Sequence, residues 1–367
     1  MPTTNPLVRL RAFGQSIWLD LLSRNLIRSG KLAELIRSDG VSGITSNPTI
    51  FDKAIGQSSD YDADIHSLTE AGKTAPEICR DLTIGDIREA ADILRPTYTK
   101  TDGEDGYVSL EVSPLLARDT RATVHEANEL WRAVNRPNVM IKIPATREGL
   151  RAITESIAAG INVNITLLFG LPRYREVAEA YIRGIEHRIA DGQDVHRIRS
   201  VASFFLSRID VLVDSKLPPA ARNLRGSAAI ASAKLAYEIY KEVFGSERFR
   251  KLQERGARKQ WLLWASTGAK SKESSDIKYV EPLIGRETVS TLPMETLEAY
   301  RDHGSPEPRL DQGADSARET MAALSSAGIE IDTITNQLED EGIKKFVHAF
   351  EELMESIEKK TRSFQRV

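Results

Sequence analysis

One lysine lies in the middle of a segment that is otherwise apolar. Lys142 belongs to the run Val-Met-Ile-Lys-Ile-Pro at residues 139–144. Burial disfavours the charged form of a lysine amine, and a neutral amine can attack a carbonyl carbon. A lysine near the end of a strand can instead extend its ammonium group into solvent. The segment by itself is compatible with both interpretations.

Two carboxylates end comparable apolar runs elsewhere in the chain. Asp20 ends the run Ile-Trp-Leu-Asp, and Glu111 lies within Val-Ser-Leu-Glu-Val. In parallel barrels the active site forms at the C-terminal ends of the strands, although an isolated acid there can equally cap a helix or pair with an arginine. One amine for covalent attack and two acids for proton transfer are what a carbon–carbon lyase or transferase needs. The combination with Lys142 therefore predicts this type of chemistry.

Small polar residues lie near the ends of the same and neighbouring apolar runs. They are Thr45, Ser46, Asn47, Asn162, Asn164, Thr166, Ser203, Ser266 and Thr267. As a group they suit a substrate with many hydroxyl groups. Each one alone could form a turn or cap a helix, and Asn47-Pro48 is a good turn signal.

Two cations are candidates for binding a phosphate. Arg208 follows the run Ser-Phe-Phe-Leu-Ser, and its planar guanidinium matches a phosphate group. The alternative for Arg208 is an ion pair with Asp210 or another helix acid. Lys270 lies in a loop that contains Gly268, where most lysines are simply solvated.

Eight apolar runs of strand length alternate with amphipathic helical segments. The expected strands are 16–20, 43–46, 107–112, 139–143, 162–166, 200–204, 261–265 and 288–292. Most are apolar on both faces, which is typical of parallel strands covered by helices. Eight such units predict a single (β/α)₈ TIM barrel in the α/β class.

The remaining segments predict additions to the barrel within one domain that spans residues 1–367. The connections 51–105 and 210–259 are long and are expected to contain extra helices. Thr74, Pro76 and Glu77 form the pattern of a capping box at a helix start. Residues 314–360 are expected to form C-terminal helices that pack on the barrel, and no linker separates a second domain.

Composition and charge exclude several classes of partner. The 367 residues carry 50 Lys and Arg against 53 Asp and Glu, a net charge of −3 that is mixed along the chain. This balance argues against a nucleic-acid or membrane-surface protein. No long apolar segment and no apolar core near the N-terminus are present. The sequence is therefore expected to be soluble and cytoplasmic, and it leaves open whether the protein is a monomer or a homodimer.

Metal and cofactor chemistry is not expected from the residue types. Cys79 is the single cysteine, so neither an intrachain disulfide nor a thiolate cluster can form. The six histidines are not spaced as ligands: His125-Glu126 begins like a zinc-protease helix, but Glu129 stands where a second histidine is required. Gly-rich phosphate loops and a Gly-x-Ser-x-Gly elbow are also missing. We expect no metal and no cofactor.

Seven segments, in order along the chain, resemble the transaldolase family. They are I-W-L-D ending at Asp20, G-I-T-S-N-P-T-I at 43–50, V-S-L-E-V around Glu111, I-K-I-P-A-T from Ile141, N-V-N-I-T-L-L-F from Asn162, S-F-F-L-S-R ending at Arg208 and G-I-K-K-F at 342–346. The resemblance extends from about residue 16 to residue 350. The region 189–196 and the long 210–259 connection resemble the larger bacterial members.

This resemblance implies a class I (Schiff-base) enzyme of the pentose phosphate pathway. Such an enzyme moves a dihydroxyacetone unit from sedoheptulose 7-phosphate to glyceraldehyde 3-phosphate, and the products are erythrose 4-phosphate and fructose 6-phosphate. It implies that Lys142 forms the Schiff base, that Glu111 and Thr166 hold a catalytic water, and that Asp20 exchanges a proton with the C4 hydroxyl. Thr45, Asn47, Asn164 and Ser203 match positions around the dihydroxyacetone unit, and Arg208 matches the phosphate-binding arginine.

The sequence departs from the family at one phosphate ligand. Members often have a second arginine two residues after the serine that matches Ser266, but here that position is Gly268, and Lys270 follows two residues later. Two other functions stay open. One is a Schiff-base aldolase that cleaves fructose 6-phosphate, although the simple aldolases it would resemble are shorter and tend to have an amide at the position of Glu111. The other is a non-catalytic sugar-phosphate-binding barrel, which would have no use for a buried lysine.

Overall fold

Eight parallel strands close into a barrel in the computed structural model, which describes residues 5–270 and 274–364. The strands are β1 (Gln15–Leu19), β2 (Val41–Ile44), β3 (Tyr107–Glu111), β4 (Val139–Pro144), β5 (Val163–Leu168), β6 (Ser200–Phe205), β7 (Trp261–Ala265) and β8 (Thr288–Leu292). Each strand pairs with the next in the chain, and β8 pairs with β1. The predicted (β/α)₈ barrel is confirmed, and each expected strand overlaps an observed one.

Helices surround the barrel and occupy the long connections, as expected. They are α1 (Pro6–Leu10), α2 (Arg24–Arg28), α3 (Lys31–Asp39), α4 (Pro48–Phe51), α5 (Asp62–Glu70), α6 (Ala75–Lys100), α7 (Thr120–Val134), α8 (Arg147–Ala158), α9 (Leu171–Ala190), α10 (Ser207–Lys216), α11 (Ala228–Phe244), α12 (Glu247–Gln253), α13 (Met294–His303), α14 (Ala314–Ser326) and α15 (Ile331–Phe364). Short helical turns are η1 (Arg11–Phe13), η2 (Asp52–Gly56), η3 (Pro114–Leu116), η4 (Pro219–Leu224) and η5 (Glu281–Leu283). The capping box of Thr74 and Glu77 is present at the start of α6.

Close packing inside the barrel requires a glycine on β2. The indole of Trp18 on β1 lies against Gly43, where a Cβ atom would be only 2.4 Å from Trp18 Cε2. The indole Nε1 donates a hydrogen bond to Asp105 Oδ1 over 2.8 Å. Gly43, the first residue of the motif at 43–50, therefore makes room for a core side chain.

The segment after Lys142 forms a tight junction between strand and helix. Thr146 is the N-cap of α8, and its Oγ1 accepts a hydrogen bond from Gly149 N over 2.9 Å. A Cβ atom at residue 149 would lie 2.0 Å from Pro144 O, so glycine is required there. These residues fix the end of β4, and with it the position of Lys142 two residues before Pro144.

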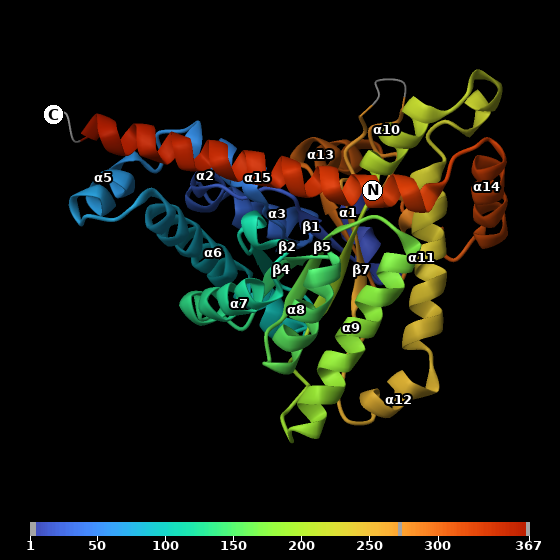
Figure 1. Cartoon of the computed structure of the whole chain (residues 1–367), viewed down its shortest axis with the longest axis horizontal. Coiled ribbons are helices and arrows are strands. Elements are labelled where there is room, and N and C mark those ends of the chain that lie inside the picture. Colours follow the sequence, from blue (N-terminus) through green and yellow to red (C-terminus); the bar gives the residue numbers. More distant parts are fainter. Residues whose placement is uncertain (1–4, 271–273, 365–367) are drawn as a thin grey trace.

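The long helix α15 crosses the C-terminal ends of the strands, which we call the barrel mouth (Figure 1). It packs against α4, α5, α6, α10 and the end of β5. A Cβ atom at Gly342 would lie 2.9 Å from Leu167 Cδ2, so the glycine lets the helix approach β5 closely. None of the helices within the described ranges is both long enough and apolar enough to cross a membrane.

Candidate active site

The register of three neighbouring strands places the predicted nucleophile beside an acid and an amide. Glu111 on β3 pairs with Lys142 on β4, which pairs in turn with Asn164 on β5. Lys142 is only 4% exposed, so its amine does not extend into solvent. Its Nζ donates to the Ser46 carbonyl oxygen over 2.9 Å and lies 3.5 Å from Glu111 Oε2. Of the two interpretations of Lys142, the buried amine is confirmed.

Glu111 is tuned toward neutrality by its surroundings. Its side chain is 6% exposed, and burial raises its pKa to about 7, while the charge of Lys142 acts in the opposite direction. A carboxyl group with this pKa can both accept and donate a proton near neutral pH.

Asp20 follows β1 at the barrel mouth and is oriented by two threonines. The Thr45 hydroxyl donates to Asp20 Oδ1 over 2.6 Å, and Thr45 Oγ1 also lies 2.7 Å from Thr291 Oγ1. Since a hydroxyl carries a single proton, Thr291 donates to Thr45 when Thr45 donates to Asp20. Burial raises the pKa of Asp20, and the hydrogen bond from Thr45 and the charge of Lys142 partly oppose this effect.

The amide of Asn164 belongs to a hydrogen-bonded chain inside the barrel. Asn164 Nδ2 donates to Ser109 Oγ over 2.9 Å, and Ser203 Oγ donates to Asn164 Oδ1 over 2.7 Å. The chain fixes the amide orientation on the strand next to Lys142. Ser109 is a member that the sequence analysis missed, and its alternation with Glu111 along β3 is the signal that places both on one face.

Thr166 lies on β5 opposite Pro144 and is fully buried. Its Oγ1 has no hydrogen-bond partner among the described residues. A buried hydroxyl is costly unless a bound water or substrate pairs with it.

A cavity of about 280 Å³ opens beside these groups at the barrel mouth. The predicted site residues that line it are Asp20, Thr45, Asn47, Lys142, Ser203, Arg208, Ser266 and Lys270. Glu111 lines a second cavity of about 410 Å³, which shares Asn47 with the first, and neither cavity is lined by Asn164 or Thr166. Asn47 has two roles, since its side chain also accepts a hydrogen bond from Ile50 N as the N-cap of α4.

Arg208 extends its guanidinium into this cavity without a carboxylate partner among the described residues. Its carbon Cζ lies 5.5 Å from the centre of the Phe205 ring and 5.9 Å from that of Phe346. Asp210, the alternative partner considered from the sequence, instead accepts from Lys278 Nζ, Tyr279 Oη and Ala229 N. Burial lowers the pKa of Arg208. Arg208 is therefore positioned to receive an anion.

Lys270 lies close to Gly268, the position where the sequence departs from the family pattern. Its Nζ lies 4.0 Å from the point where a Cβ atom of residue 268 would be. Ser266 has a left-handed backbone (φ of 54°), and its Oγ lies 2.8 Å from Ser207 Oγ. The loop after β7 thus folds back and places a cation beside Gly268.

The structure also corrects and extends the set of polar residues. The interpretation of Asn162 as substrate-facing is wrong, because its side chain bonds backbone groups of Pro137, Val139 and Arg199 at the opposite end of the barrel. Thr267 Oγ1 donates to the carbonyl oxygen of Thr291 and ties β7 to β8.

The sequence analysis missed several lining residues, among them Lys53, Thr291 and Phe346. Phe346 was part of a recognised motif, and its spacing of four residues from Gly342 places both on the face of α15 that meets the barrel. Lys53 and Thr291 gave no sequence signal, because lysines in helical turns and threonines in strands are common in all proteins. Cys79 is buried, and burial raises the pKa of its thiol to about 12.

No three His, Cys, Asp or Glu side chains among residues 5–270 and 274–364 are grouped as metal ligands would be.

Comparison with known proteins gives a consistent result over nearly the whole chain. Residues 17–357 match the family described as Transaldolase/Fructose-6-phosphate aldolase. A protein named Transaldolase from Thiobacillus denitrificans is 48% identical, with 94% of this chain and 97% of that protein covered. One from Saccharopolyspora erythraea is 49% identical over 97% and 98% of the two chains, and Transaldolase 1 of Streptomyces avermitilis is 50% identical over 97% and 95%. The chain therefore belongs to the transaldolase and fructose-6-phosphate aldolase family, whose members are enzymes.

Proposed function

We propose that this protein is a transaldolase of the pentose phosphate pathway that transfers a dihydroxyacetone unit between sugar phosphates through a Schiff base on Lys142. The observation that carries the proposal is the buried Lys142 amine, 3.5 Å from a carboxyl group whose pKa is about 7. The names of relatives that are 48–50% identical support the same activity.

Imine formation begins when the Lys142 amine attacks the ketone carbon of the donor sugar. The carbinolamine then loses its hydroxyl as water, which requires a proton donor beside the nitrogen. Glu111 is suited to this role, since it can take a proton from the attacking amine and return it to the leaving hydroxyl. At 3.5 Å from Lys142 Nζ, Glu111 is close enough to exchange this proton, and the unpaired Thr166 hydroxyl is a suitable partner for the water that is released.

Cleavage of the C3–C4 bond requires a base for the proton of the C4 hydroxyl. Asp20 lines the cavity with Lys142, and Thr45 holds one of its two carboxylate oxygens, so the other is available. As the proton moves to Asp20, the C4 carbon becomes the aldehyde of erythrose 4-phosphate. The bonding electrons move into the protonated imine, and the three-carbon unit stays on Lys142 as an enamine.

Transfer follows when the enamine attacks the aldehyde of glyceraldehyde 3-phosphate and Asp20 returns its proton to the new hydroxyl. Hydrolysis of the imine then releases fructose 6-phosphate. Arg208, Lys270 and Lys53 line the same cavity and give it a positive side for the phosphate of each substrate. Phe346 covers the cavity from α15 and limits access of water to the enamine.

Borohydride trapping with fructose 6-phosphate tests the proposal directly. Intact mass and peptide mapping should find a reduced three-carbon adduct on Lys142. The adduct should be depleted when glyceraldehyde 3-phosphate or erythrose 4-phosphate is added before the reductant. A Lys234→Ala control should form the same adduct, because that lysine lies on the outer helix α11 and donates to the carbonyl oxygens of Arg309 and Gln312.

The other outcomes separate the alternatives. An adduct that neither acceptor depletes would replace transfer by simple aldol cleavage. The absence of any adduct would leave a sugar-phosphate-binding barrel without covalent chemistry.

A further inference from the structure

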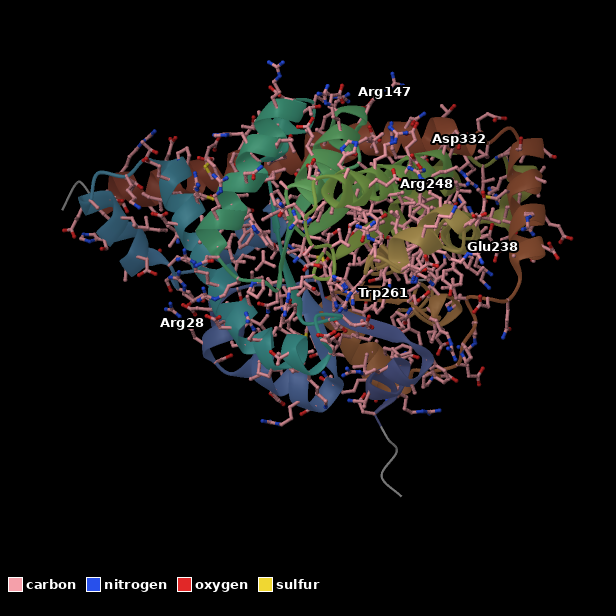
Figure 2. The ribbon with its side chains drawn as sticks, turned by 90° about the horizontal axis from the view of Figure 1, so that it is seen from below. Arg28, Arg147, Glu238, Arg248, Trp261 and Asp332 are labelled. Carbon is pink, nitrogen blue, oxygen red and sulfur yellow. The ribbon has the colours of Figure 1, made fainter. Side chains whose placement is uncertain are left out.

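A second cavity, of about 470 Å³, lies at the opposite end of the barrel from Lys142. Its lining comes from the starts of strands: Gly14 precedes β1, Arg199 precedes β6, and Trp261 is the first residue of β7. All eight strands are parallel, so these positions share the N-terminal end. In the view from below, Trp261 lies near the middle of the molecule, with Arg28 and Glu238 toward its sides (Figure 2). The proposed reaction makes no use of this cavity.

The charge of this cavity is opposite to that of the whole chain. Five cationic side chains line it: Arg11, Arg199, Arg258, Lys259 and Arg286. Two acids, Glu104 and Glu287, line it as well, so five positive charges minus two negative charges leave +3. The chain as a whole carries −3. A concave positive region on a negative protein attracts anions.

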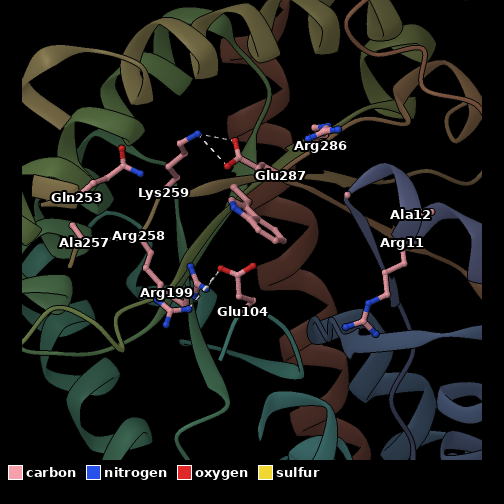
Figure 3. A pocket seen from close by; sticks show the side chains of 12 residues that line it. Arg11, Ala12, Glu104, Arg199, Gln253, Ala257, Arg258, Lys259, Arg286 and Glu287 are labelled. Atoms are coloured by element: carbon pink, nitrogen blue, oxygen red, sulfur yellow. Dashed lines mark hydrogen bonds and ion pairs between the residues drawn. The ribbon is translucent and has the colours of Figure 1, made fainter. Parts of the chain in front are cut away.

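Three of the five cations have acidic partners that hold them in place. Lys259 Nζ lies 2.8 Å from Glu287 Oε2, and Arg199 Nη2 donates to Glu104 Oε1 over 2.7 Å (Figure 3). Arg258 bonds Asp102, which lies outside the cavity lining. These pairs fix three cations on one side of the cavity and leave its net charge positive.

The other two cations, Arg11 and Arg286, have no side-chain hydrogen bond or ion pair among the described residues. Both are exposed, and they lie across the cavity from Gln253 and Ala257 (Figure 3). Arg11 belongs to η1 before β1, and Arg286 precedes β8, the strand that pairs with β1. Gly14, three residues after Arg11, lies against Arg286, because a Cβ atom at Gly14 would lie 3.2 Å from Arg286 Cα. Two guanidinium groups from adjoining segments can bind two phosphate groups of one ligand.

We propose that this cavity is an anion site for a ligand with a diphosphate group, bound between Arg11 and Arg286. Such a ligand would connect the segment before β1 to the start of β8 and would stabilise the folded chain by mass action. Inorganic diphosphate and a nucleoside diphosphate share this chemistry. Trp261 and Ala257 add apolar surface that a nucleoside would cover and inorganic diphosphate would not. The proposal is independent of the transaldolase reaction.

Thermal unfolding with inorganic diphosphate or ADP, at constant ionic strength set with chloride, tests the site. We expect either probe to raise Tm by about 2 °C or more when its concentration is about a hundred times its Kd. Arg286→Glu and Arg11→Gln should each abolish the shift. Arg222→Glu is the matched control: it makes the same charge change at an exposed arginine of η4 and should retain the shift.

Anions can also bind the cations near Lys142, so a second control is needed. Arg208→Ala, at the barrel mouth, should retain the shift. Binding of ADP, whose nucleoside would cover Trp261, should also change tryptophan fluorescence, and Trp261→Phe should lose that change. The proposal is overturned if neither probe shifts Tm, if Arg286→Glu leaves the shift intact, or if Arg208→Ala removes it. With the site established, tenfold tighter binding of ADP than of diphosphate would identify a nucleotide, and equal binding would identify recognition of the diphosphate group alone.

Discussion

Two aspartates at opposite ends of the barrel are bonded in different ways. Asp105, in the loop before β3, accepts hydrogen bonds from Ser16 Oγ, Trp18 Nε1 and its neighbour Gly106 N. Asp20, at the barrel mouth, accepts a side-chain hydrogen bond from Thr45 and otherwise faces a cavity. Burial raises the pKa of both. The difference indicates that an acid saturated with donors serves the fold, whereas an acid with an open oxygen beside a cavity is available for chemistry.

The greatest loss of activity is expected at the barrel mouth, where Lys142→Ala should lower kcat by about 10⁴-fold or more, since Lys142 is the buried amine beside Glu111 that forms the imine. The fold should persist, because Glu111, left without its cation, can keep its proton and stay neutral. Steady-state transfer of the three-carbon unit to glyceraldehyde 3-phosphate measures the rate, and circular dichroism measures the fold. Wild-type turnover in a folded variant would exclude the Schiff-base mechanism.

The same substitution at each of the two aspartates should separate an effect on catalysis from an effect on folding. Asp20→Asn should lower kcat by about 10³-fold, within the range of general acid–base catalysis, and should still allow borohydride trapping of the intact donor. Asp105→Asn should instead destabilise the fold by about 2 kcal/mol, because an amide presents N–H groups to donors that need an acceptor. Denaturant unfolding and kcat per folded molecule separate the two effects. If Asp105→Asn removed activity without loss of stability, the assignment of Asp105 to the fold would be wrong.

Much of the fold and of the candidate active site could be predicted from the sequence. The eight strands and the placement of Lys142, Glu111 and Asp20 at strand ends follow from apolar runs and from the way a parallel barrel brings those ends together. Asn162 was misplaced because a polar residue next to a strand looks the same at either end. Arg11 and Arg286 line one cavity only because β1 pairs with β8, and the packing of Phe346 over the cavity at the mouth depends on how α15 crosses it. Contacts of this kind are set by the closed fold and leave no local pattern.

A smaller effect, with a clear pH signature, is expected for Glu111→Gln. The variant should slow imine formation by about 100-fold and remove an inflection near pH 7 from the kcat profile, because the pKa of Glu111 is about 7.

The raised pKa of Glu111 also makes the stability of the folded protein depend on pH. The folded state holds the proton up to about pH 7 while the unfolded chain releases it near 4.5, so wild type loses stability across this interval. Unfolding at a series of pH values should show Glu111→Gln gaining stability relative to wild type between pH 4.5 and 7. A parallel profile for the two proteins would contradict the raised pKa.

The smallest effect on turnover is expected for Arg208→Ala, which tests whether the unpaired cation at the mouth binds substrate. Loss of a charge-assisted hydrogen bond of about 1.5–3 kcal/mol corresponds to a rise in KM of about 10- to 100-fold. The rise should be confined to phosphorylated sugars, with kcat within a fewfold of wild type, because the guanidinium is distant from the bond that is cleaved. Arg222→Ala, on the exposed turn η4, is the matched control and should leave both constants unchanged. An equal rise in KM for sedoheptulose and its 7-phosphate would mean that Arg208 maintains the shape of the cavity through Phe205 and Phe346 rather than binding the phosphate.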